Sequence, residues 1–498
     1  LQLATEEYYR CMIFCSSEYE NSTMRPKLVI EYKIKESHQA PISNVRKISA
    51  THGGFTGKLD INDQFYVGTP IGDINDDGIE DMAVGAMVDD DGVTDAGAVW
   101  ILFLNADRTV NHYQKISATT GGFSANLNAD RFGSAVTSIG DFDKDGVEDI
   151  AVGAYYSDNG AGAIYLIFLK KDGTVKSYQK ISASEGGLQN LTANRFFGSS
   201  VCPLGDLNND GTIDLAVGAP NYDNDGGLYC GSIWILFLNP DGTVKNQQII
   251  SQTQVGFNQT LHDMDRFGRI VSNIGDIDGD GINDIAASCE GDDDGGVDSG
   301  ALYILFLNSN GTVKGKQKIS ATQGNFTGTI NSGDNFGCSS VGLGDVDGDG
   351  INDIAVGALW SDQDGADRGK LFILNLNRNG TVKSWKEINP SSPALQNLLD
   401  NGDQFGGALS VFPEVNPSGN KELIIGARGD DDGFTDAGAV YILDLGVSNF
   451  LTLSKNKVTF TASSGTDHIS VSSNVSWTAN SDQPWLTVNP TSGTGNDT

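Results

Sequence analysis

The chain has 498 residues, and its 63 glycines, 12 prolines and 19% charged residues are typical of a turn-rich all-β protein. Its 65 acidic and 32 basic residues give a formal net charge of −33, which argues against nucleic acid or an anionic membrane surface as a partner. No apolar run reaches the length of about eighteen residues that a membrane-spanning helix needs, so we expect no direct membrane insertion.

The N-terminal segment ends in a β-rich stretch, Ser16-Ser-Glu-Tyr-Glu-Asn-Ser-Thr-Met-Arg25-Pro26-Lys-Leu-Val-Ile-Glu-Tyr32. This stretch resembles the final strand of a DNRLRE-type β-sandwich, a module found beside extracellular carbohydrate-active modules. We therefore expect residues 1–40 to be the C-terminal remnant of a preceding β-sandwich module. The chain also starts at Leu1 without a methionine. We expect it to be part of a larger multidomain protein.

Residues 41–446 contain one acidic nine-residue loop, D-x-[DN]-x-D-G-x-x-D, five times at spacings of 65 to 70 residues. Oxygen side chains at positions 1, 3, 5 and 9 suit a hard cation such as calcium, which takes about six to eight oxygen ligands. The glycine at position 6 lets the backbone turn sharply around an ion. We therefore predict about five calcium ions, with the residue at position 7 included in each site. The predicted metal-site residues, loop by loop, are Asp73, Asn75, Asp77, Ile79 and Asp81; Asp141, Asp143, Asp145, Val147 and Asp149; Asp206, Asn208, Asp210, Thr212 and Asp214; Asp276, Asp278, Asp280, Ile282 and Asp284; and Asp345, Asp347, Asp349, Ile351 and Asp353.

The loop has two alternative interpretations, and both fit the sequence less well. A single loop of this kind could be a solvated turn, but five copies in register make a chance pattern a poor account. An EF-hand needs a bidentate glutamate at position 12 and flanking helices. The flanks here are β-rich, and position 12 is Val84, Val152, Val217, Ala287 or Val356. A sixth loop of equal length is degraded, with Glu414, Asn416, Ser418 and Glu422 at the ligand positions.

The loops are part of a longer unit with four short β-rich runs, best seen between Phe132 and Ser182. The third run is continuously apolar, which predicts burial on both faces. The second run carries a glycine and an alanine, such as Gly153-Ala154, which predict close approach of a neighbouring backbone. Four-stranded sheets packed face to face around an axis need both features, so the unit predicts a β-propeller.

The number of units fixes the number of blades. First strands are expected to begin at six phenylalanines: Phe65, Phe132, Phe197, Phe267, Phe336 and Phe405. The sixth unit lacks a fourth strand, but an extra copy, Arg46-Lys-Ile48-Ser-Ala50, precedes the first unit. We therefore predict a six-bladed β-propeller of four-stranded blades, closed by an N-terminal strand at residues 46–50. Closure removes the free sheet edge that an open array would expose.

The Phe-Gly pair, the acidic loop and the Gly-Ala pair at fixed offsets resemble the FG-GAP repeats of integrin α-subunit propellers and related bacterial proteins. The resemblance covers residues 46–446. It implies that the loops hold calcium on one face and that the opposite face binds ligand. Three departures stand out: Tyr66 follows Phe65, blade four reads Ala286-Ala-Ser-Cys289, and the count gives six blades where integrins have seven.

A second acidic turn lies between the second and third strands and so at the opposite end of each blade. Asp89, Asp91 and Asp95 mark it in blade one, and Asp430, Asp432 and Asp436 mark it in blade six. Further cations could bind here. The alternative is that aspartate and glycine simply form good hairpin turns.

No residues form a catalytic pattern. The five histidines are scattered, and none accompanies a nucleophile motif. A pair of catalytic carboxylates could not be recognised among so many turn aspartates. The six cysteines follow no zinc spacing, which leaves buried thiols or a few disulfides.

Residues 447–498 change to alternating strands with tryptophans of a buried type, Val475-Ser-Trp477-Thr-Ala and Pro484-Trp485-Leu-Thr-Val488. The pattern indicates an immunoglobulin-like sandwich. The stretch from Trp477 to Gly493 resembles the BACON domain of Bacteroidetes surface and secreted proteins, a family linked to glycan or mucin contact. We expect a partial β-sandwich here, because the segment is short.

These observations predict a calcium-binding β-propeller module of a secreted or bacterial cell-surface adhesin. Its role would be adhesion, or binding of a glycan or cell-surface protein, without catalysis. Two alternatives remain open: a structural spacer in a long surface protein, and an accessory module of a polysaccharide-processing enzyme.

Overall fold

The computed structural model describes residues 9–13, 27–31, 38–222, 227–253, 256–416, 419–446, 451–453, 467–473, 476–481 and 487–494. These residues are almost entirely in strands and turns, with one short helix, α1, at Ser157–Gly160. The chain divides into two compact units, one of which is Gln39–Gly446. The other unit combines Leu1–His38 with Val447–Thr498. Among the described residues, no helix has the length and apolar character needed to cross a membrane.

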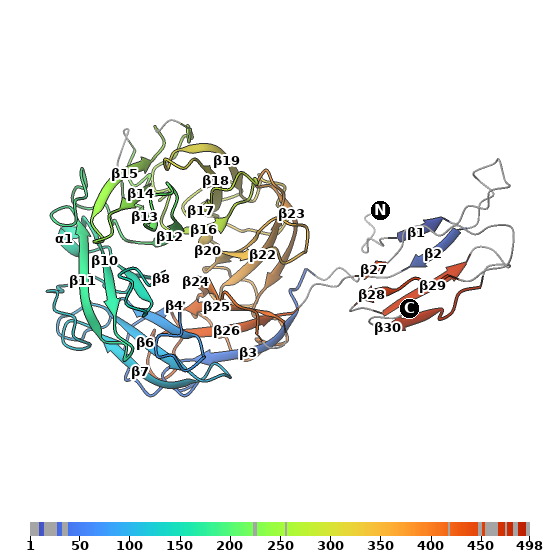
Figure 1. Cartoon of the computed structure of the whole chain (residues 1–498), viewed down its shortest axis with the longest axis horizontal. Helices are drawn as coiled ribbons and strands as arrows, with labels where there is room; N and C mark the ends of the chain where they lie inside the picture. The colour runs from blue at the N-terminus through green and yellow to red at the C-terminus, as the bar shows by residue number, and fades with distance from the viewer. Residues whose placement is uncertain are drawn as a thin grey trace. The chain divides into compact units, whose positions relative to one another are not determined.

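The larger unit is a ring of six four-stranded antiparallel sheets (Figure 1), which confirms the predicted β-propeller and its blade number. In blades one to five the four strands pair as a meander in chain order, whereas in blade six three such strands are joined by β3. The strands of blades one to three are β4 Phe65–Gly72, β5 Asp81–Ala86, β6 Ala98–Leu104 and β7 Val110–Ile116; β8 Ala135–Gly140, β9 Asp149–Ala154, β10 Ala163–Leu169 and β11 Val175–Ser182; and β12 Val201–Gly205, β13 Asp214–Ala219, β14 Ser232–Leu238 and β15 Val244–Ile250. Those of blades four to six are β16 Val271–Gly275, β17 Asp284–Cys289, β18 Ala301–Leu307 and β19 Val313–Ile319; β20 Phe336–Gly344, β21 Asp353–Ala358, β22 Lys370–Leu376 and β23 Val382–Ile388; and β24 Phe405–Val411, β25 Lys421–Ala427, β26 Ala439–Leu445 and, from the N-terminal side, β3 Ile42–Ile48.

Strand β3 closes the ring as the outer strand of blade six. It pairs antiparallel with β26, with Ile48 opposite Val440 and Val45 opposite Leu443. The predicted closure is therefore right, but its position at residues 46–50 is corrected to 42–48. The strand ends before Ser49 because that hydroxyl donates a hydrogen bond to Asp432 Oδ2 at 2.7 Å, which turns the chain into a loop.

Three first strands begin later than the predicted phenylalanines: β8 at Ala135, β12 at Val201 and β16 at Val271. In these three blades, pairing with the second strand begins only after the Phe-Gly pair, whereas the phenylalanines of blades one, five and six already pair with that strand. Phe132 N–H donates to Ala96 O at 2.9 Å, and the other five phenylalanines make the same bond to the blade before them. All six rings are fully buried. The Phe-Gly pair is thus a link between blades as well as the start of a strand.

The glycine of the second strand permits this link. A Cβ added at Gly153 would lie 2.1 Å from the carbonyl oxygen of Gly198, which belongs to the next blade. Gly85, Gly218, Gly357 and Gly426 face a next-blade carbonyl oxygen at 2.0 to 2.2 Å in the same way. The third strands β6, β10, β14 and β18 are buried along their whole length, as their apolar sequences predict. The cores therefore lie between neighbouring blades.

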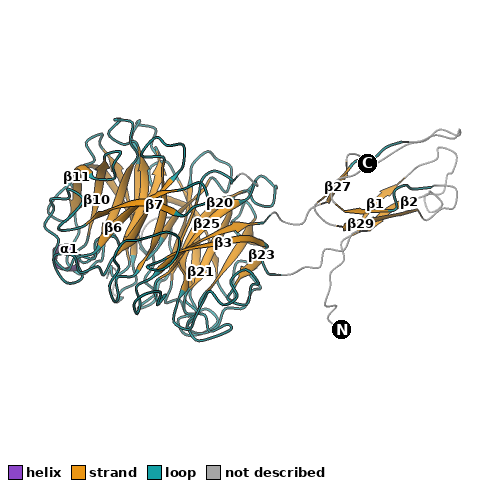
Figure 2. Cartoon of the chain, turned by 90° about the horizontal axis from the view of Figure 1, so that it is seen from below, coloured by secondary structure: helices purple, strands orange, loops and turns teal. Residues whose placement is uncertain are grey.

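The meander gives the propeller two distinct faces, with loops at both ends of the strands (Figure 2). One end carries the five repeated loops, at 73–81, 141–149, 206–214, 276–284 and 345–353; we call it the acidic-loop face. The other end carries the turns after the second strands and the long connections between blades; we call it the connection face.

The smaller unit contains a sheet built from both flanks of the propeller. Its order is β1 (Tyr9–Ile13), β2 (Lys27–Glu31), β29 (Ser476–Ser481) and β30 (Ser492–Thr494), with Ile30 of β2 opposite Ala479 of β29. Strands β27 (Leu451–Leu453) and β28 (Val471–Ser473) form a separate pair. Within β29, Trp477 is buried, as its predicted type requires. The sequence predicts separate modules for the two flanks. In the structure, strands from both flanks are hydrogen-bonded in one sheet.

The cysteines of the propeller favour the thiol alternative. Cys202, Cys289 and Cys338 are buried thiols outside any disulfide among the described residues. Burial raises the pKa of the Cys202 and Cys338 thiols to about 12. Both groups are therefore protonated at neutral pH. Cys15 lies outside the described residues.

Candidate metal centres

Each repeated loop folds around the carboxylate at position 1. In blade two, Asp141 accepts the N–H of Asp145 on Oδ1 and the N–H of Gly146 on Oδ2, both at 2.9 Å. Asp73, Asp206, Asp276 and Asp345 accept the same two bonds in their loops. Gly146 has φ of 89°, in the left-handed region, and a Cβ there would meet nothing within 4 Å. Glycine is therefore needed because the turn requires a positive φ, and not because a side chain would clash with a neighbour.

The position-9 aspartate anchors the loop to the blade. Asp149 is fully buried, and it accepts the N–H of Leu169 at the end of β10 and the N–H of Phe142 in the loop, both at 3.0 Å. The equivalent Asp81, Asp214, Asp284 and Asp353 are fully buried and bonded in the same pattern. Burial raises the pKa to about 7 for Asp81, Asp149 and Asp353 and to about 6 for Asp214 and Asp284.

The loop brings most of the predicted ligand side chains together. In blades two, four and five, carboxylate oxygens of positions 1, 3 and 9 lie within 4.8 Å of one another: Asp141, Asp143 and Asp149; Asp276, Asp278 and Asp284; Asp345, Asp347 and Asp353. Blades one and three have Asn75 and Asn208 at position 3. The oxygens Asp143 Oδ1 and Asn208 Oδ1 are buried and have no hydrogen-bond partner among the described residues. Such an oxygen fits a hard cation.

The position-5 aspartates contact lysines that the sequence pattern did not predict. Lys176, in β11, lies 2.8 Å from Asp143 Oδ2 and 2.5 Å from Asp145 Oδ2. Its hydrogen bond lowers the pKa of Asp145. Lys245, Lys314 and Lys383 hold the same place in blades three to five, and Asn111 replaces them in blade one. The available signal was the Thr-Val-Lys sequence that opens each of these four strands.

Blade six neutralises its buried carboxylate differently. Glu422 stands at position 9 of the degraded loop and is 1% exposed. Arg108 Nη2 lies 2.8 Å from its Oε2, and Arg46 Nη1 lies 3.1 Å from its Oε1. Within the described part of the chain, the five position-9 aspartates have no lysine or arginine ion pair of this kind. Ser418 of the sixth loop lies outside the described residues.

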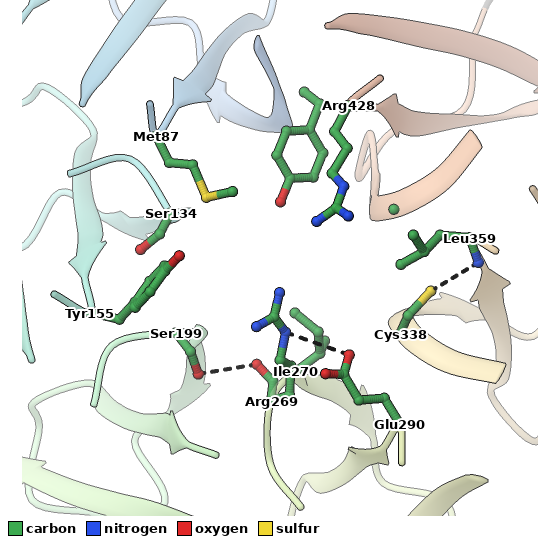
Figure 3. A pocket seen from close by; sticks show the side chains of 12 residues that line it. Met87, Ser134, Tyr155, Ser199, Arg269, Ile270, Glu290, Cys338, Leu359 and Arg428 are labelled. Atoms are coloured by element: carbon green, nitrogen blue, oxygen red, sulfur yellow. Dashed lines mark hydrogen bonds and ion pairs between the residues drawn. The ribbon is translucent and has the colours of Figure 1, made fainter. Parts of the chain in front are cut away.

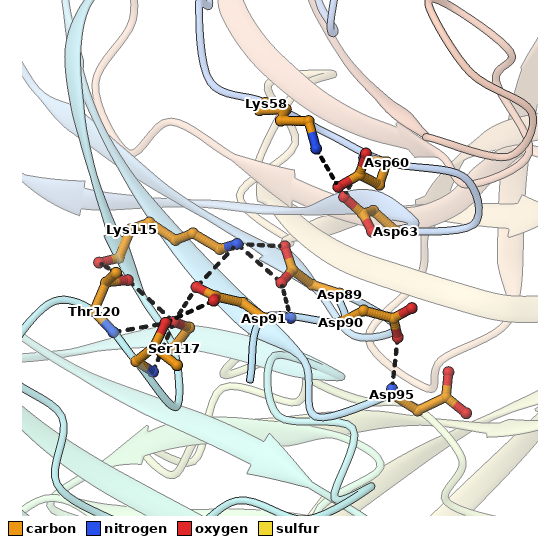
Figure 4. A network of polar contacts seen from close by, with 11 residues as sticks. Lys58, Asp60, Asp63, Asp89, Asp90, Asp91, Asp95, Lys115, Ser117 and Thr120 are labelled. Atoms are coloured by element: carbon orange, nitrogen blue, oxygen red, sulfur yellow. Dashed lines mark hydrogen bonds and ion pairs between the residues drawn. The ribbon is translucent and has the colours of Figure 1, made fainter. Parts of the chain in front are cut away.

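The acidic turns on the connection face hold lysine side chains (Figure 4). Lys115 Nζ lies 2.9 Å from Asp89 Oδ2 and 3.4 Å from Asp91 Oδ2, while the N–H of Asp95 donates to Asp90. Lys318 sits in the same way between Asp292 and Asp294, and Lys47 sits between Asp430 and Asp432. These lysines supply positive charge at the turns, as Lys176 does at the loop of blade two, and further cations at the turns stay a prediction.

A buried aspartate beside these turns was not predicted from the sequence either. It stands two residues before the phenylalanine in five blades, as Asp63, Asp130, Asp265, Asp334 and Asp403. Burial is the main cause that raises the pKa of Asp63 and Asp403 to about 7, and the nearby charges of Asp89 and Asp430 add to it. The repeated Asp-x-Phe pattern was the available signal.

We expect Asp403 to make the protein less stable as pH rises from about 5 to about 7.5. Its pKa of about 7 lies above the ordinary value of 3.8, so the folded state binds the proton more tightly, and this advantage is lost as pH passes the folded pKa. Asp403→Asn should therefore lose less stability than the wild type over this range, measured by urea unfolding at fixed calcium concentration. Glu185→Gln, at an exposed acidic residue on the connection face of another blade, should follow the wild type. Equal pH dependence of all three proteins would contradict the assignment.

Comparisons with known proteins agree with the repeats. The FG-GAP repeat model matches residues 132–167, 197–236 and 339–374, and the Viral BACON domain model matches residues 450–498. Mouse (Mus musculus) integrin alpha-2 is 32% identical over 204 residues, which are 40% of this chain and 15% of that protein. Human integrin alpha-11 is 38% identical over 151 residues, 30% of this chain and 12% of that protein. The chain thus spans a small part of the length of these relatives.

Among solved structures, a chain of the Photorhabdus luminescens Tc holotoxin pore aligns with a TM-score of 0.37 and 13% identity, covering 88% of this chain and 18% of that chain. That likeness is too low to inform on function. The repeat matches and the six observed blades carry the assignment instead. The repeated part of this chain is therefore an FG-GAP β-propeller related to those of integrin α subunits, followed by a BACON-like domain.

Proposed function

We propose that the propeller is a calcium-binding module of a secreted or cell-surface adhesin, which mediates adhesion or binds a glycan or surface protein without catalysis. The contrast between blade six and the other blades carries the calcium part of this proposal. One buried position-9 carboxylate is neutralised by two arginines, whereas the other five lack such partners among the described residues. A divalent cation would supply the missing charge.

The ions would bind to the side-chain oxygens at positions 1, 3, 5 and 9 and to the position-7 residue of each loop. Bound calcium would neutralise the buried position-9 carboxylates and draw the loop onto the blade. The side chains of Lys176, Lys245, Lys314 and Lys383 would share the position-3 and position-5 carboxylates with the ion or swing away from them. Five divalent ions would reduce the formal charge from −33 to about −23.

The adhesion part rests on the relation to integrin α subunits and on the adjoining BACON-like domain. Both are consistent with a role outside the cell or at its surface. A saturable signal on a glycan array or on a cell layer, present with calcium and lost with a chelator, would support the module. A protein that folds with calcium but gives no saturable binding would refute the adhesion part.

Replacing Asp145 with alanine should remove one ion and leave the others. We expect the wild type to retain about five calcium ions per chain and Asp145→Ala to retain about four, measured by plasma mass spectrometry after gel filtration. Asp172→Ala is the matched control, because Asp172 is an exposed aspartate on the same face that bonds only to Thr174 of its own turn. An unchanged ion count in Asp145→Ala would contradict the site.

A further inference from the structure

A pocket on the propeller axis is lined by residues of all six blades, at the connection-face ends of the first and second strands (Figure 3). The lining residues either begin a first strand or directly follow a second strand, such as Tyr155 after β9, Glu290 after β17 and Arg428 after β25. The meander places these positions at the end of the blade away from the acidic loops. The pocket is therefore separate from the candidate metal centres.

Two arginines from different blades point their guanidinium groups into this hollow (Figure 3). Arg269 Nε lies 3.5 Å from Glu290 Oε2, and Arg266 Nη1 lies 3.1 Å from Glu290 Oε1. Arg428 Nε donates to Gln404 Oε1, and its guanidinium lies over the Trp360 ring at 5.2 Å. Within the described part of the chain, the terminal Nη groups of Arg269 and Arg428 donate no hydrogen bond.

The pocket is locally positive on a strongly acidic chain. Glu290 is the one carboxylate among the residues that line it, and two arginines share that carboxylate. Arg269 and Arg428 therefore line the pocket with one carboxylate, which Arg266 also contacts from outside the lining, on a chain with a formal net charge of −33. Arg269 keeps 33% of its side chain accessible, so a small ligand can reach it. Burial raises the pKa of Tyr155, so its hydroxyl is protonated at neutral pH and can donate.

Tyr66 and Tyr155 line the pocket with aromatic rings, and other rings lie beside these lining residues. Tyr155 contacts Tyr156 and Phe196 at centroid distances of 5.3 and 5.4 Å, and Tyr156 is 45% exposed. Trp360 supports Arg428 on the other side. Flat apolar rings beside a few polar donors are typical of small-ligand sites. Paired guanidinium forks are suited to a carboxylate, which accepts two parallel N–H bonds from each.

We propose that this axial pocket binds the carboxylate of an acidic sugar, a hexuronic or sialic acid at the end of a glycan. Arg269 and Arg428 hold the carboxylate from two sides of the pocket, and Glu290 fixes Arg269 through its Nε side. The rings of Tyr66 and Tyr155 contact the sugar ring. The choice of a glycan rests on the proposed adhesion function, whereas the choice of a carboxylate rests on the pocket alone.

The test measures binding of glucuronic acid and N-acetylneuraminic acid to the calcium-loaded chain by saturation-transfer NMR and calorimetry. Glucose is the neutral match, and a glutamate-containing peptide tests the other source of a carboxylate. We expect both acidic sugars to bind at least about tenfold more tightly than glucose. Arg428→Gln should weaken the binding of both acidic sugars by about tenfold or more. Arg368→Gln, a connection-face arginine that bonds to Asn401 and does not line the pocket, should leave binding unchanged.

Several outcomes overturn the inference: no binding, equal binding of glucose, or acidic-sugar binding that Arg428→Gln leaves intact. Binding of the peptide but not of the sugars would overturn the glycan as the source. Arg428→Gln must melt like the wild type; if it does not, Arg428→Lys, which keeps the charge but loses the fork, takes its place with the same expected loss. Glycan adhesion that survives Arg428→Gln would support the adhesion function and reject the pocket as its site. Acidic-sugar binding without adhesion would support the pocket and reject the adhesion function.

Discussion

Removal of calcium is expected to lower the melting temperature of the propeller by about 15 °C. A ligand that binds only the folded state stabilises it by about 2.7 kcal/mol per site when its concentration is a hundredfold above Kd. Five such sites together contribute about 13 kcal/mol, which is comparable with the whole stability of an ordinary domain. The reason lies in the position-9 aspartates, which are buried as acceptors of strand and loop N–H groups and need a positive charge nearby.

Calorimetry with and without a chelator, at constant pH and ionic strength, measures this shift. Re-addition of calcium should restore the melt, and Asp145→Ala should show about four-fifths of the wild-type shift, since one of five sites is lost. Asp172→Ala should show the full shift. A wild-type melting temperature that the chelator leaves unchanged would contradict the calcium proposal.

Gly153→Ala is expected to destabilise the propeller by about 3 kcal/mol or more. The new methyl group would lie 2.1 Å from the carbonyl oxygen of Gly198. That oxygen belongs to backbone, and Gly198 is itself bonded through its N–H to Gly218 O at 3.0 Å, so a small local shift cannot relieve the overlap. Urea unfolding in saturating calcium measures the loss.

The matched control is Ser288→Ala, at the same position in blade four. A side chain is already present there, and its Oγ accepts the N–H of Ile270 at 2.8 Å. Its replacement should cost only the hydrogen bond, about 1 kcal/mol. Similar losses in the two variants would mean that the glycine is not required for the contact between blades.

The fold followed from the sequence because its signals are local and repeated. Continuous apolar third strands and small residues in the second strands predict the ring of blades. The sixth unit lacks a fourth strand of its own, and this absence predicts how the ring is closed. The late starts of β8, β12 and β16 could not be seen, because the phenylalanine bonds to the previous blade in all six units and the motif does not show in which units the strand begins at that residue.

The candidate site was predictable only in part, for a related reason. The aspartates of the loops are adjacent in sequence, so their convergence follows from the motif. The partners that balance them come from elsewhere: Lys176 reaches Asp143 from 33 residues away, and Arg108 reaches Glu422 across 314 residues. The first contact forms only when the fourth strand of a blade folds back beside the loop, and the second forms only when the ring is closed.

The way β3 closes the ring also determines how the module responds to tension. Ile42 is opposite Leu445 at one end of the β3–β26 pair, and Gly446 N–H donates to Pro41 O at 2.7 Å just beyond it. The chain therefore enters and leaves the propeller at a single point. Tension applied at Pro41 and Gly446 would act on this one bonded pair and would break its hydrogen bonds one after another from that end. As long as the β3–β26 pair stays bonded, the other five blades would carry none of the load.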